Sequence, residues 1–377
     1  MIYNDAQSLA PVIAAFKQAS PPPGRLSGLC GFDGFIDTFI RMEAPDTMAE
    51  FGPKVAAAAG IAASYTVRHE GDKFGGNGPL FASGLHGIWG GNIDITYIGA
   101  MGRDEVLPIY LEALEAKTKR LVTLAEPAHS DCLEFRDGKI MLSDLRSCAE
   151  ITLDRLLERA GPLDAELRDA RYIAAVNWGK LANVGEIWSH LAARLAALGR
   201  PAKDVVFFMD LAEFEHRPAA DVAGLLERLA PITRQCRTVL SFNLKEGWQM
   251  AAHLGGDFHG KKQPEAVLDL ARFLRARIAV DRIIVHPNDG AATADENDAV
   301  YLPAPFCREP LISTGAGDNF GAGCLSGMLL GLDLAGTLLA GNSSSGFFVR
   351  AGRTGSFAEL AALAEAWAAG SLPERLQ

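Results

Sequence analysis

The sequence predicts an α/β fold, in which a mostly parallel β-sheet lies between two layers of helices and carries a smaller β-sheet. Short apolar segments rich in β-forming residues recur along the chain, and helical patterns separate most of them. Strands that are apolar on both faces are typical of parallel sheets covered on both sides. Two strand-like stretches do not follow this alternation, and they predict the smaller sheet. A chain of 377 residues can bury a substantial core.

Composition and charge exclude several classes of protein. Hydrophobic residues make up 49% and charged residues 22% of the chain, which argues against a disordered, fibrous or multi-span membrane protein. The net charge is −10, so we expect no nucleic-acid partner. The most membrane-like stretch, 320–332, is short and interrupted by glycines, so we expect no membrane partner.

Cysteine and histidine spacing predicts neither disulfides nor zinc. The six cysteines lie far apart without a CxxC pair, and the eight histidines form no HExxH pattern. The first ten residues lack the pattern of a secretory signal. We therefore expect reduced thiols and a cytoplasmic protein.

The N-terminal segment 1–24 is expected to form a leader helix over 5–19 that stops at the breaker 21–24. The apolar run 26–32 then predicts a first core strand. It ends in Asp33, at the kind of strand end where α/β sheets bind ligands.

The smaller sheet is predicted from segments in the first half of the chain. Residues 37–45 and 64–74 are expected to be strands, and Asp137-Gly138 predicts a hairpin within 131–144. We expect these strands to form a lid built from two inserted segments, approximately 38–74 and 128–146.

The remaining elements follow the alternation of strands and helices. Core strands are expected at 93–99, 172–176, 205–209, 238–242 and 283–285. Helices are expected at 55–63, 79–89, 184–198, 222–229 and 265–278, and a buried helix at 320–332.

The most informative pattern is Gly315-Ala316-Gly317-Asp318, which leads into an apolar helix. Small residues let backbone N–H groups converge at the helix start, where the helix dipole favours an anion. A carboxylate there would repel a phosphate, so Asp318 is better explained as a base that deprotonates a hydroxyl attacking that phosphate. The alternative is an aspartate that caps a helix after a glycine turn.

Three further patterns each have a chemical and a structural interpretation. Asn243 and Glu246 follow an apolar strand and can hold the water shell of Mg²⁺, or they can simply begin a helix. The segment 75–78, Gly-Gly-Asn-Gly, can bring backbone close to a polyol, or it is an ordinary turn. Asp33 and Asp37 can accept hydrogen bonds from sugar hydroxyls, or they are solvated loop acids.

Along the chain the patterns follow the order acidic strand end, Gly-Gly-Asn-Gly, Asn243 with Glu246, and then Gly315–Asp318. In this order they resemble the PfkB/ribokinase family of carbohydrate kinases over roughly residues 26–357. The resemblance includes Gly102-Arg103-Asp104 and the late helix 342–349. It implies one ribokinase-like domain over 1–377, a three-layer αβα sandwich with a mostly parallel sheet and a projecting β-sheet lid. It also implies transfer of the γ-phosphate of ATP, with Mg²⁺, to a hydroxyl of a small sugar or sugar-like alcohol, and a homodimer formed through the lid.

The resemblance implies roles for individual residues. Asp318 would be the catalytic base and Gly315, Ala316 and Gly317 the anion hole, while Asn243 and Glu246 would bind Mg²⁺ through water. Sugar contacts are implied for Asp33, Asp37, Gly76, Asn77 and Arg103, and nucleotide contacts for Asn243, Glu246, Gly290 and Asn342.

The chain departs from the family pattern at three places. Ile312 stands where many relatives have an acidic residue that supports a monovalent-cation site, and Leu80 stands where the glycine motif usually continues with Asn. The loop 286–290 lacks the usual Thr-x-Gly start that contacts the phosphate donor.

Two other functions remain open. A nucleoside kinase would need a larger, more aromatic acceptor site, which Phe35, Phe39 and Trp178 could supply. A non-catalytic regulator on the same fold would sense sugar or nucleotide, although the intact Asp318 argues against it. A Walker A-like stretch at 255–262 is rejected, because Lys262 replaces the required Ser or Thr and the stretch follows a helix.

Overall fold

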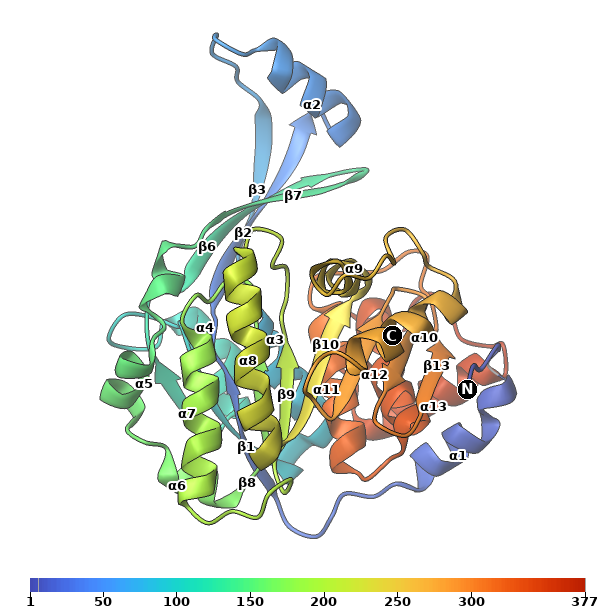
Figure 1. The fold of residues 1–377 in the computed structure, drawn as a ribbon. Helices are drawn as coiled ribbons and strands as arrows, with labels where there is room; N and C mark the ends of the chain where they lie inside the picture. The colour runs from blue at the N-terminus through green and yellow to red at the C-terminus, as the bar shows by residue number, and fades with distance from the viewer. Residues whose placement is uncertain (6, 377) are drawn as a thin grey trace.

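The computed structural model describes residues 1–5 and 7–376, in which a large sheet and a small sheet meet (Figure 1). The large sheet has nine strands in the order β13-β12-β11-β10-β9-β8-β1-β4-β5. Its strands are β1 (Leu26–Gly31), β4 (Ile93–Gly99), β5 (Arg120–Thr123), β8 (Ala170–Val176), β9 (Val206–Asp210), β10 (Arg237–Asn243), β11 (Arg282–His286), β12 (Gly290–Ala294) and β13 (Ala299–Pro303). Only the pairs β11–β12 and β12–β13, at one edge, are antiparallel among the described residues. The predicted mostly parallel sheet is confirmed.

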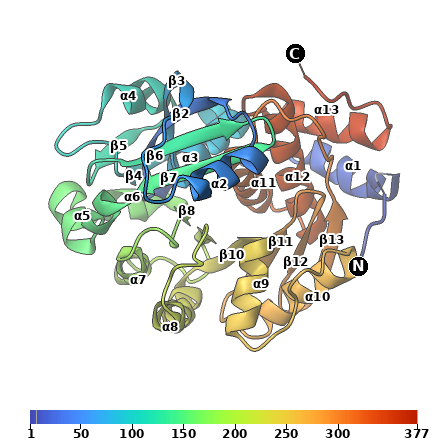
Figure 2. The same ribbon diagram turned by 90° about the horizontal axis from the view of Figure 1, so that it is seen from above.

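Helices cover both faces of the large sheet (Figure 2). One face carries α5 (Leu153–Ala160), α6 (Asp164–Asp169), α7 (Val184–Ala197), α8 (Ala219–Gln235), α9 (Leu244–His253) and α10 (Pro264–Arg275). The other carries α1 (Ala10–Gln18), α3 (Asn77–Trp89), α4 (Pro108–Leu114), α11 (Ala316–Leu329), α12 (Leu334–Ala351) and α13 (Phe357–Ala368). None of the helices in the described residues combines the length and apolar character that crossing a membrane requires.

The core lies on both sides of the central strands, because successive side chains of a strand point to opposite faces. Neighbouring residues of β9 show this: the ring of Phe207 packs against Trp188 of α7, and that of Phe208 against Phe81 of α3. Both phenylalanines are fully buried. This two-sided burial is why the central strands are apolar throughout.

The leader helix α1 packs against the C-terminal helices, where the rings of Phe16 and Phe357 lie 4.8 Å apart. The helix is shorter than predicted, because residues 7–9 form a 3₁₀ turn that leads into it. Residue 6 of the predicted helix lies outside the described residues.

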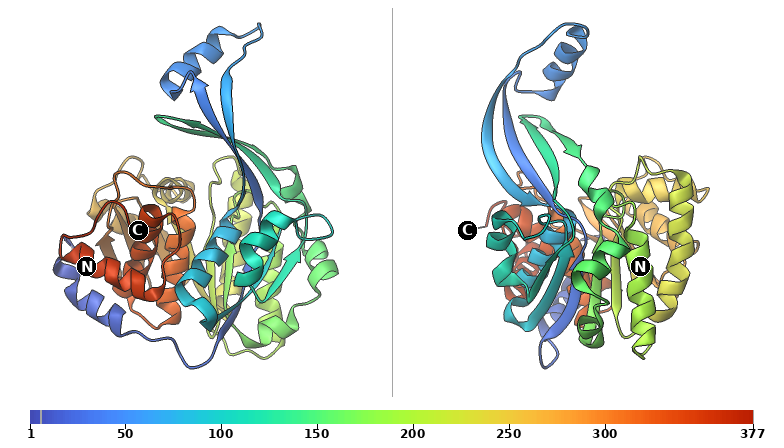
Figure 3. Two further views of the ribbon diagram at one scale, coloured as in Figure 1. Left: turned by 180° about the vertical axis from the view of Figure 1, so that it is seen from behind. Right: turned by 90° about the vertical axis from the view of Figure 1, so that its left-hand side faces the viewer.

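The small sheet projects from the body of the molecule (Figures 1 and 3). Its strands, in the order β3-β2-β6-β7, are β2 (Phe35–Ala44), β3 (Thr66–Gly75), β6 (Ala128–Phe135) and β7 (Gly138–Asp144). The β6–β7 pair confirms the predicted hairpin. Because β2 begins four residues after β1 ends, the small sheet grows directly from the edge of the large one.

The helix between β2 and β3 begins and ends earlier than predicted. It is α2 (Met48–Ala57), not 55–63. Thr47 caps it by accepting a hydrogen bond from the backbone of Glu50, and the Asp137 carboxylate accepts one from the backbone of Met48 at 2.7 Å. The cap from the β6–β7 turn is non-local, so the sequence pattern could not reveal it.

Helices α11 and α12 pack closely because glycines face each other. A Cβ atom added to Gly323 would lie 2.5 Å from the backbone oxygen of Ala340 and 2.8 Å from Cα of Gly341. This contact fixes α11, and hence the Gly315–Asp318 segment at its start.

Gly323→Ala is expected to destabilise the protein by about 1–3 kcal/mol, because the added methyl group has no space between the two helices. Gly224→Ala in α8 is the matched control. Its Cβ would meet no atom within 4 Å, so a stabilisation of about 0.5–1 kcal/mol is expected there. Urea unfolding of both variants measures the difference, and equal effects would contradict the close packing.

Candidate active site

The candidate site lies at the carboxyl ends of the parallel strands, the edge from which the small sheet projects. Asp33 follows β1, Asn177 follows β8, and Asp210 and Asn243 end β9 and β10. Parallel strands place these polar residues along one edge of the sheet, where α/β folds bind ligands.

The carboxylate of Asp33 joins three parts of this edge. It accepts hydrogen bonds from the backbone N–H groups of Asn77 and Gly78, at 2.8 and 2.7 Å, and from Asn177 Nδ2 at 2.6 Å. Burial raises the pKa of Asp33, and these hydrogen bonds oppose the rise. Asp33 is fully buried, so the structure places it beneath the site as an anchor for the start of α3. The left-handed φ of 102° at Gly76 shapes the turn that precedes this anchor.

Asp318 faces Asn77 across the site, where Asn77 Nδ2 donates a hydrogen bond of 2.8 Å to Asp318 Oδ1. Burial raises the pKa of Asp318 well above its ordinary value, and the nearby charges of Asp210 and Asp33 raise it further. The residue as a whole is only half-buried. Asp318 therefore has the access and the proton affinity that a general base needs.

The alternative role of Asp318 as a helix cap is not what the structure shows. Gly315, in the left-handed conformation with φ 91°, occupies the cap position of α11, and Asp318 lies in the first turn. The N–H group of Ala316 donates to the backbone oxygen of Ser313, whereas that of Gly317 has no protein acceptor in the described residues. The start of α11 thus offers at least one free donor to an anion.

Asn243 and Glu246 form a reciprocal cap at the start of α9. The Glu246 carboxylate accepts a hydrogen bond from the Asn243 backbone at 3.0 Å, and Asn243 Oδ1 accepts one from the Glu246 backbone at 3.0 Å. The structural interpretation of this pair is therefore confirmed, and it leaves the proposed metal role untested.

Glu246 also belongs to a group of carboxylates that sequence analysis did not find. Burial and then the charge of Asp210 raise the pKa of Glu246 to about 8, with smaller contributions from Glu213 and Asp318. Burial raises the pKa of Asp210 to about 6. The available signal was the position of Asp210 at a strand end, the same signal that identified Asp33.

This acidic group fits Mg²⁺ bound through water better than a directly bound metal. No three Asp, Glu, His or Cys side chains in the described part of the chain converge to form a metal cage. Mg²⁺ in phosphoryl-transfer sites keeps several waters and takes one or two protein carboxylates together with substrate phosphates. Glu246 and Asp210 supply such carboxylates.

Asp37 lies on β2, a strand of the small sheet, and is 6% exposed. Burial raises its pKa, and the ammonium groups of Lys139 and Lys180 oppose that rise. Gly75 leaves the space that the carboxylate fills, since an added Cβ would lie 2.7 Å from Asp37 Cγ. Lys139 Nζ also donates to Thr314 Oγ1, so the β6–β7 hairpin contacts the loop before α11.

A cavity of about 510 Å³ lies beside the acidic group. Asn243, His286, Gly317 and Asn342 line it, together with the loop 304–308. Asn342 Nδ2 donates to the Pro303 backbone oxygen at 3.0 Å. The cavity is thus continuous with the start of α11, and it is large enough for part of a nucleotide.

His286 at the end of β11 is a second residue that sequence analysis missed. Its ring packs on Phe320, with centroids 4.5 Å apart, and burial lowers its pKa to about 4. Its Nε2 atom is buried without a partner in the described residues. The sequence signal for this position was that the loop 286–290 departs from the family pattern. The structure places a neutral imidazole ring there that can form a hydrogen bond.

Two predicted site residues lie apart from this group. The exposed Arg103 lies near Glu126 and Glu150, at 3.9 and 4.0 Å. Gly290 begins β12, close to the ring of Tyr301, and does not line the cavity. Neither placement supports the predicted contact with substrate or nucleotide.

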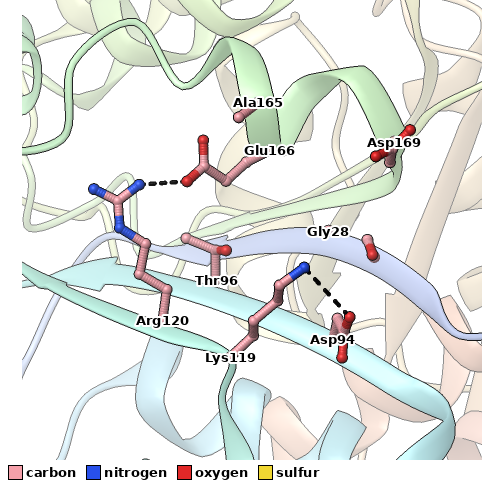
Figure 4. A pocket seen from close by; sticks show the side chains of 9 residues that line it. Gly28, Asp94, Thr96, Lys119, Arg120, Ala165, Glu166 and Asp169 are labelled. Carbon is pink, nitrogen blue, oxygen red and sulfur yellow. Dashed lines mark hydrogen bonds and ion pairs between the residues drawn. The ribbon is translucent and has the colours of Figure 1, made fainter.

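Another pocket of about 320 Å³ lies at the opposite end of the sheet, between β4, β5 and α6 (Figure 4). Its cations are already paired: Arg120 contacts Glu166, and Lys119 lies 3.6 Å from Asp94. Asp318, the free N–H group of Gly317 and the acidic group are all at the other end of the sheet. The candidate site is therefore the edge described above.

Comparisons with known proteins agree with this arrangement. The family model of prokaryotic ketohexokinase matches residues 19–367. A ketohexokinase from Haloferax volcanii is 26% identical over 368 residues, which cover 92% of this chain and 93% of that protein.

Solved structures share the fold at low identity. The ribokinase of Arabidopsis thaliana, complexed with ribose and ATP, has a TM-score of 0.63 and 15% identity, covering 90% of this chain and 99% of that chain. An adenosine kinase from Sinorhizobium meliloti has a TM-score of 0.61 and 17% identity, covering 91% and 99%. The ribokinase-like fold expected from the sequence is confirmed. With the family match over nearly the whole chain, it follows that the chain belongs to the prokaryotic ketohexokinase family of carbohydrate kinases, phosphotransferases with an alcohol group as acceptor.

Proposed function

We propose that this carbohydrate kinase transfers the γ-phosphate of ATP to a hydroxyl of a ketohexose, with Asp318 as the general base. The observation that carries the proposal is the hydrogen bond from Asn77 to Asp318, because it joins the polyol-binding turn to the base at the start of α11. The match to the ketohexokinase family supports the choice of a ketohexose as acceptor.

The sugar would lie under the small sheet, between Asp37 and Asn77. Asp318 takes the proton of the acceptor hydroxyl, whose oxygen then forms a bond to the γ-phosphorus as the bond to ADP breaks. The free N–H groups at the start of α11, including that of Gly317, stabilise the negative charge that develops on the transferred group. The small sheet acts as a lid that excludes water and so limits hydrolysis of ATP.

The nucleotide would lie in the 510 Å³ cavity, between the acidic group and α12. Asn342 would face the adenine base of the nucleotide. His286 would contact the phosphates, to which its unpartnered nitrogen would donate a hydrogen bond. Glu246 and Asn243, with Asp210, would hold Mg²⁺ through water. The ion supplies positive charge that neutralises the phosphates.

Two of the three aromatic residues of the nucleoside-kinase alternative are not free to form an acceptor site. The third, Phe39, is half-buried on β2, with the Lys73 ammonium 4.6 Å from its ring centroid. Trp178 is 3% exposed and packs on Phe214, and the Arg217 guanidinium covers its ring. Phe35 is 4% exposed. Both residues therefore belong to the core, which favours a small sugar over a nucleoside.

Two further predictions remain proposals. The free thiols of the cysteines support a cytoplasmic location. The exposed edge of β7 and the side chains of Met141 and Leu142 support a homodimer formed through the lid.

The direct test of this function is to measure ADP release with a panel of different acceptor alcohols. ADP release is expected to be fastest with ketohexoses and slower by at least about tenfold with aldoses, polyols and nucleosides. A coupled assay over such a panel measures it. If nucleosides were the best acceptors, the nucleoside-kinase alternative would replace this proposal, and ligand binding without ADP release would favour the regulator.

Asp318→Asn is expected to lower turnover by about 10²–10⁴-fold, because the amide cannot accept the hydroxyl proton. Sugar and ADP binding should change little, since the amide oxygen still accepts the hydrogen bond from Asn77. Calorimetry and steady-state rates measure both effects. Asp333→Asn is the matched control, because Asp333 caps α12 outside the site and Asn caps helices equally well. Turnover above about a tenth of wild type would refute the role of Asp318.

Glu246→Gln is expected to lower turnover and to raise the Mg²⁺ concentration that gives half-maximal rate. In metal-free protein the same variant should lose less stability with rising pH. The pKa of Glu246 is raised from 4.5 to about 8 in the folded state. The folded protein therefore keeps a proton that the unfolded chain releases, and wild-type stability falls as the pH rises through this window.

Urea unfolding between pH 5 and pH 8, with a chelator present, measures this difference. The control is Glu359→Gln, in the second capping box of the chain. The pKa of Glu359 is lowered to about 2, chiefly by the hydrogen bond from Arg353, so its variant should be destabilised equally across the window. Parallel pH curves for wild type and Glu246→Gln would contradict the prediction.

A further inference from the structure

One face of α12 holds the loop that forms a wall of the nucleotide cavity. Asn342, Gly346 and Arg350 are spaced four residues apart, so they lie on the same side of the helix. Asn342 Nδ2 donates to the Pro303 backbone oxygen at 3.0 Å. An added Cβ at Gly346 would lie 2.6 Å from Pro305 Cγ, so only glycine allows this approach.

Arg350 makes the third and strongest of these contacts. It is 3% exposed and donates to the backbone oxygens of Pro305 at 2.7 Å, Phe306 at 2.7 Å and Gly346 at 3.0 Å. Burial lowers the pKa of Arg350, but a guanidinium remains charged in proteins. Its planar fork thus fixes two consecutive carbonyl groups of the loop, which a lysine could not do in the same geometry.

The segment 371–376 holds the loop from its other side. Arg350 Nε donates to the Pro373 backbone oxygen at 3.0 Å. The Glu374 carboxylate accepts a hydrogen bond from the Arg308 backbone at 3.0 Å, and Cys307 Sγ lies 3.6 Å from the Glu374 backbone oxygen. The loop is therefore fixed between α12 and this segment.

The fixed loop presents an apolar side chain to the cavity. Phe306 lines the cavity and is 53% exposed, although its backbone oxygen is bound by Arg350. Among the exposed large apolar side chains of the described residues it is the one aromatic ring, and a planar nucleotide base is a chemically suitable partner for it. Ordering this wall in advance lowers the entropy lost when a ligand binds.

We propose that Arg350 and the segment 371–376 are positioning elements that hold Phe306 and its loop as a preformed wall for the base of the nucleotide. The inference rests on the proposed function, in which ATP occupies this cavity. It goes beyond that function because neither Arg350 nor Glu374 lines the cavity. Substituting either residue should therefore weaken nucleotide binding and leave the sugar site and the general base Asp318 intact.

The test uses two variants that loosen the loop from opposite sides, Arg350→Lys and Glu374→Ala. The KM for ATP and the Kd for ADP are expected to rise about fivefold, as the loss of a buried hydrogen bond predicts. The KM for the sugar and kcat should stay near wild-type values. Glu374→Gln keeps an acceptor for the Arg308 N–H group and should restore binding. Arg353→Lys, at an exposed arginine near the end of the same helix, is the control.

The rate at which Cys307 is labelled measures the mobility of the loop, and this measurement needs no nucleotide. Cys307 is the one cysteine in the described residues that is not buried, so a maleimide should label it first. Labelling is expected to be several-fold faster in Arg350→Lys and Glu374→Ala than in wild type and the control. If Arg350→Lys does not fold, Glu374→Ala decides the result.

Two outcomes distinguish this inference from the proposed function. Wild-type rates of labelling together with unchanged ADP affinity in Glu374→Ala would overturn the inference and leave the kinase function standing. A wild-type protein that binds neither ADP nor ATP would overturn the proposed function, and with it the role of the loop as a nucleotide wall.

Discussion

The buried carboxylate of Asp33 is the interaction on which the site depends. It joins the end of β1 to the end of β8, through Asn177, and to the start of α3, through the backbone of Asn77 and Gly78. Burying a charge is costly unless hydrogen bonds replace its water, and three donors do so here. This anchor holds the backbone of Asn77, whose side chain donates to Asp318. One buried carboxylate thus connects the Gly76–Asn77 turn, through Asn77, with Asp318.

The acidic group shows how function and stability oppose each other in this fold. Burial and the charge of Asp210 disfavour the charged form of Glu246, and burial disfavours that of Asp210. The neighbouring cation, Lys245, lies against Glu213 instead. In a structural site such groups would be costly. Under the proposed function, Mg²⁺ would bring positive charge to this place when the nucleotide binds. The buried carboxylates would then carry an electrostatic cost between turnovers that binding of the ion relieves.

Local patterns predicted the parts of the fold that local physics determines. The apolar strands, the Asp137-Gly138 hairpin and the glycine-rich start of α11 all follow from composition and spacing. Contacts between distant segments could not be predicted in this way. The sequence shows Asp33 at a strand end, but not that a backbone N–H group 44 residues later donates a hydrogen bond to its carboxylate. It likewise shows an arginine near the end of a helix, but not that Arg350 binds the carbonyl groups of a loop 44 residues earlier.

The origin of the small sheet has a consequence for how such enzymes diverge. Its strands come from two insertions that return to the same edge, while the base, the acidic group and the cavity belong to the large sheet. Asp37 and Lys139 lie on these strands, and Lys139 contacts Thr314 in the loop before α11. Under the proposed function, substitutions in the two small-sheet segments would change which alcohol is accepted while phosphoryl transfer is preserved. Gene duplication followed by drift in these segments would then be a short route to a new specificity.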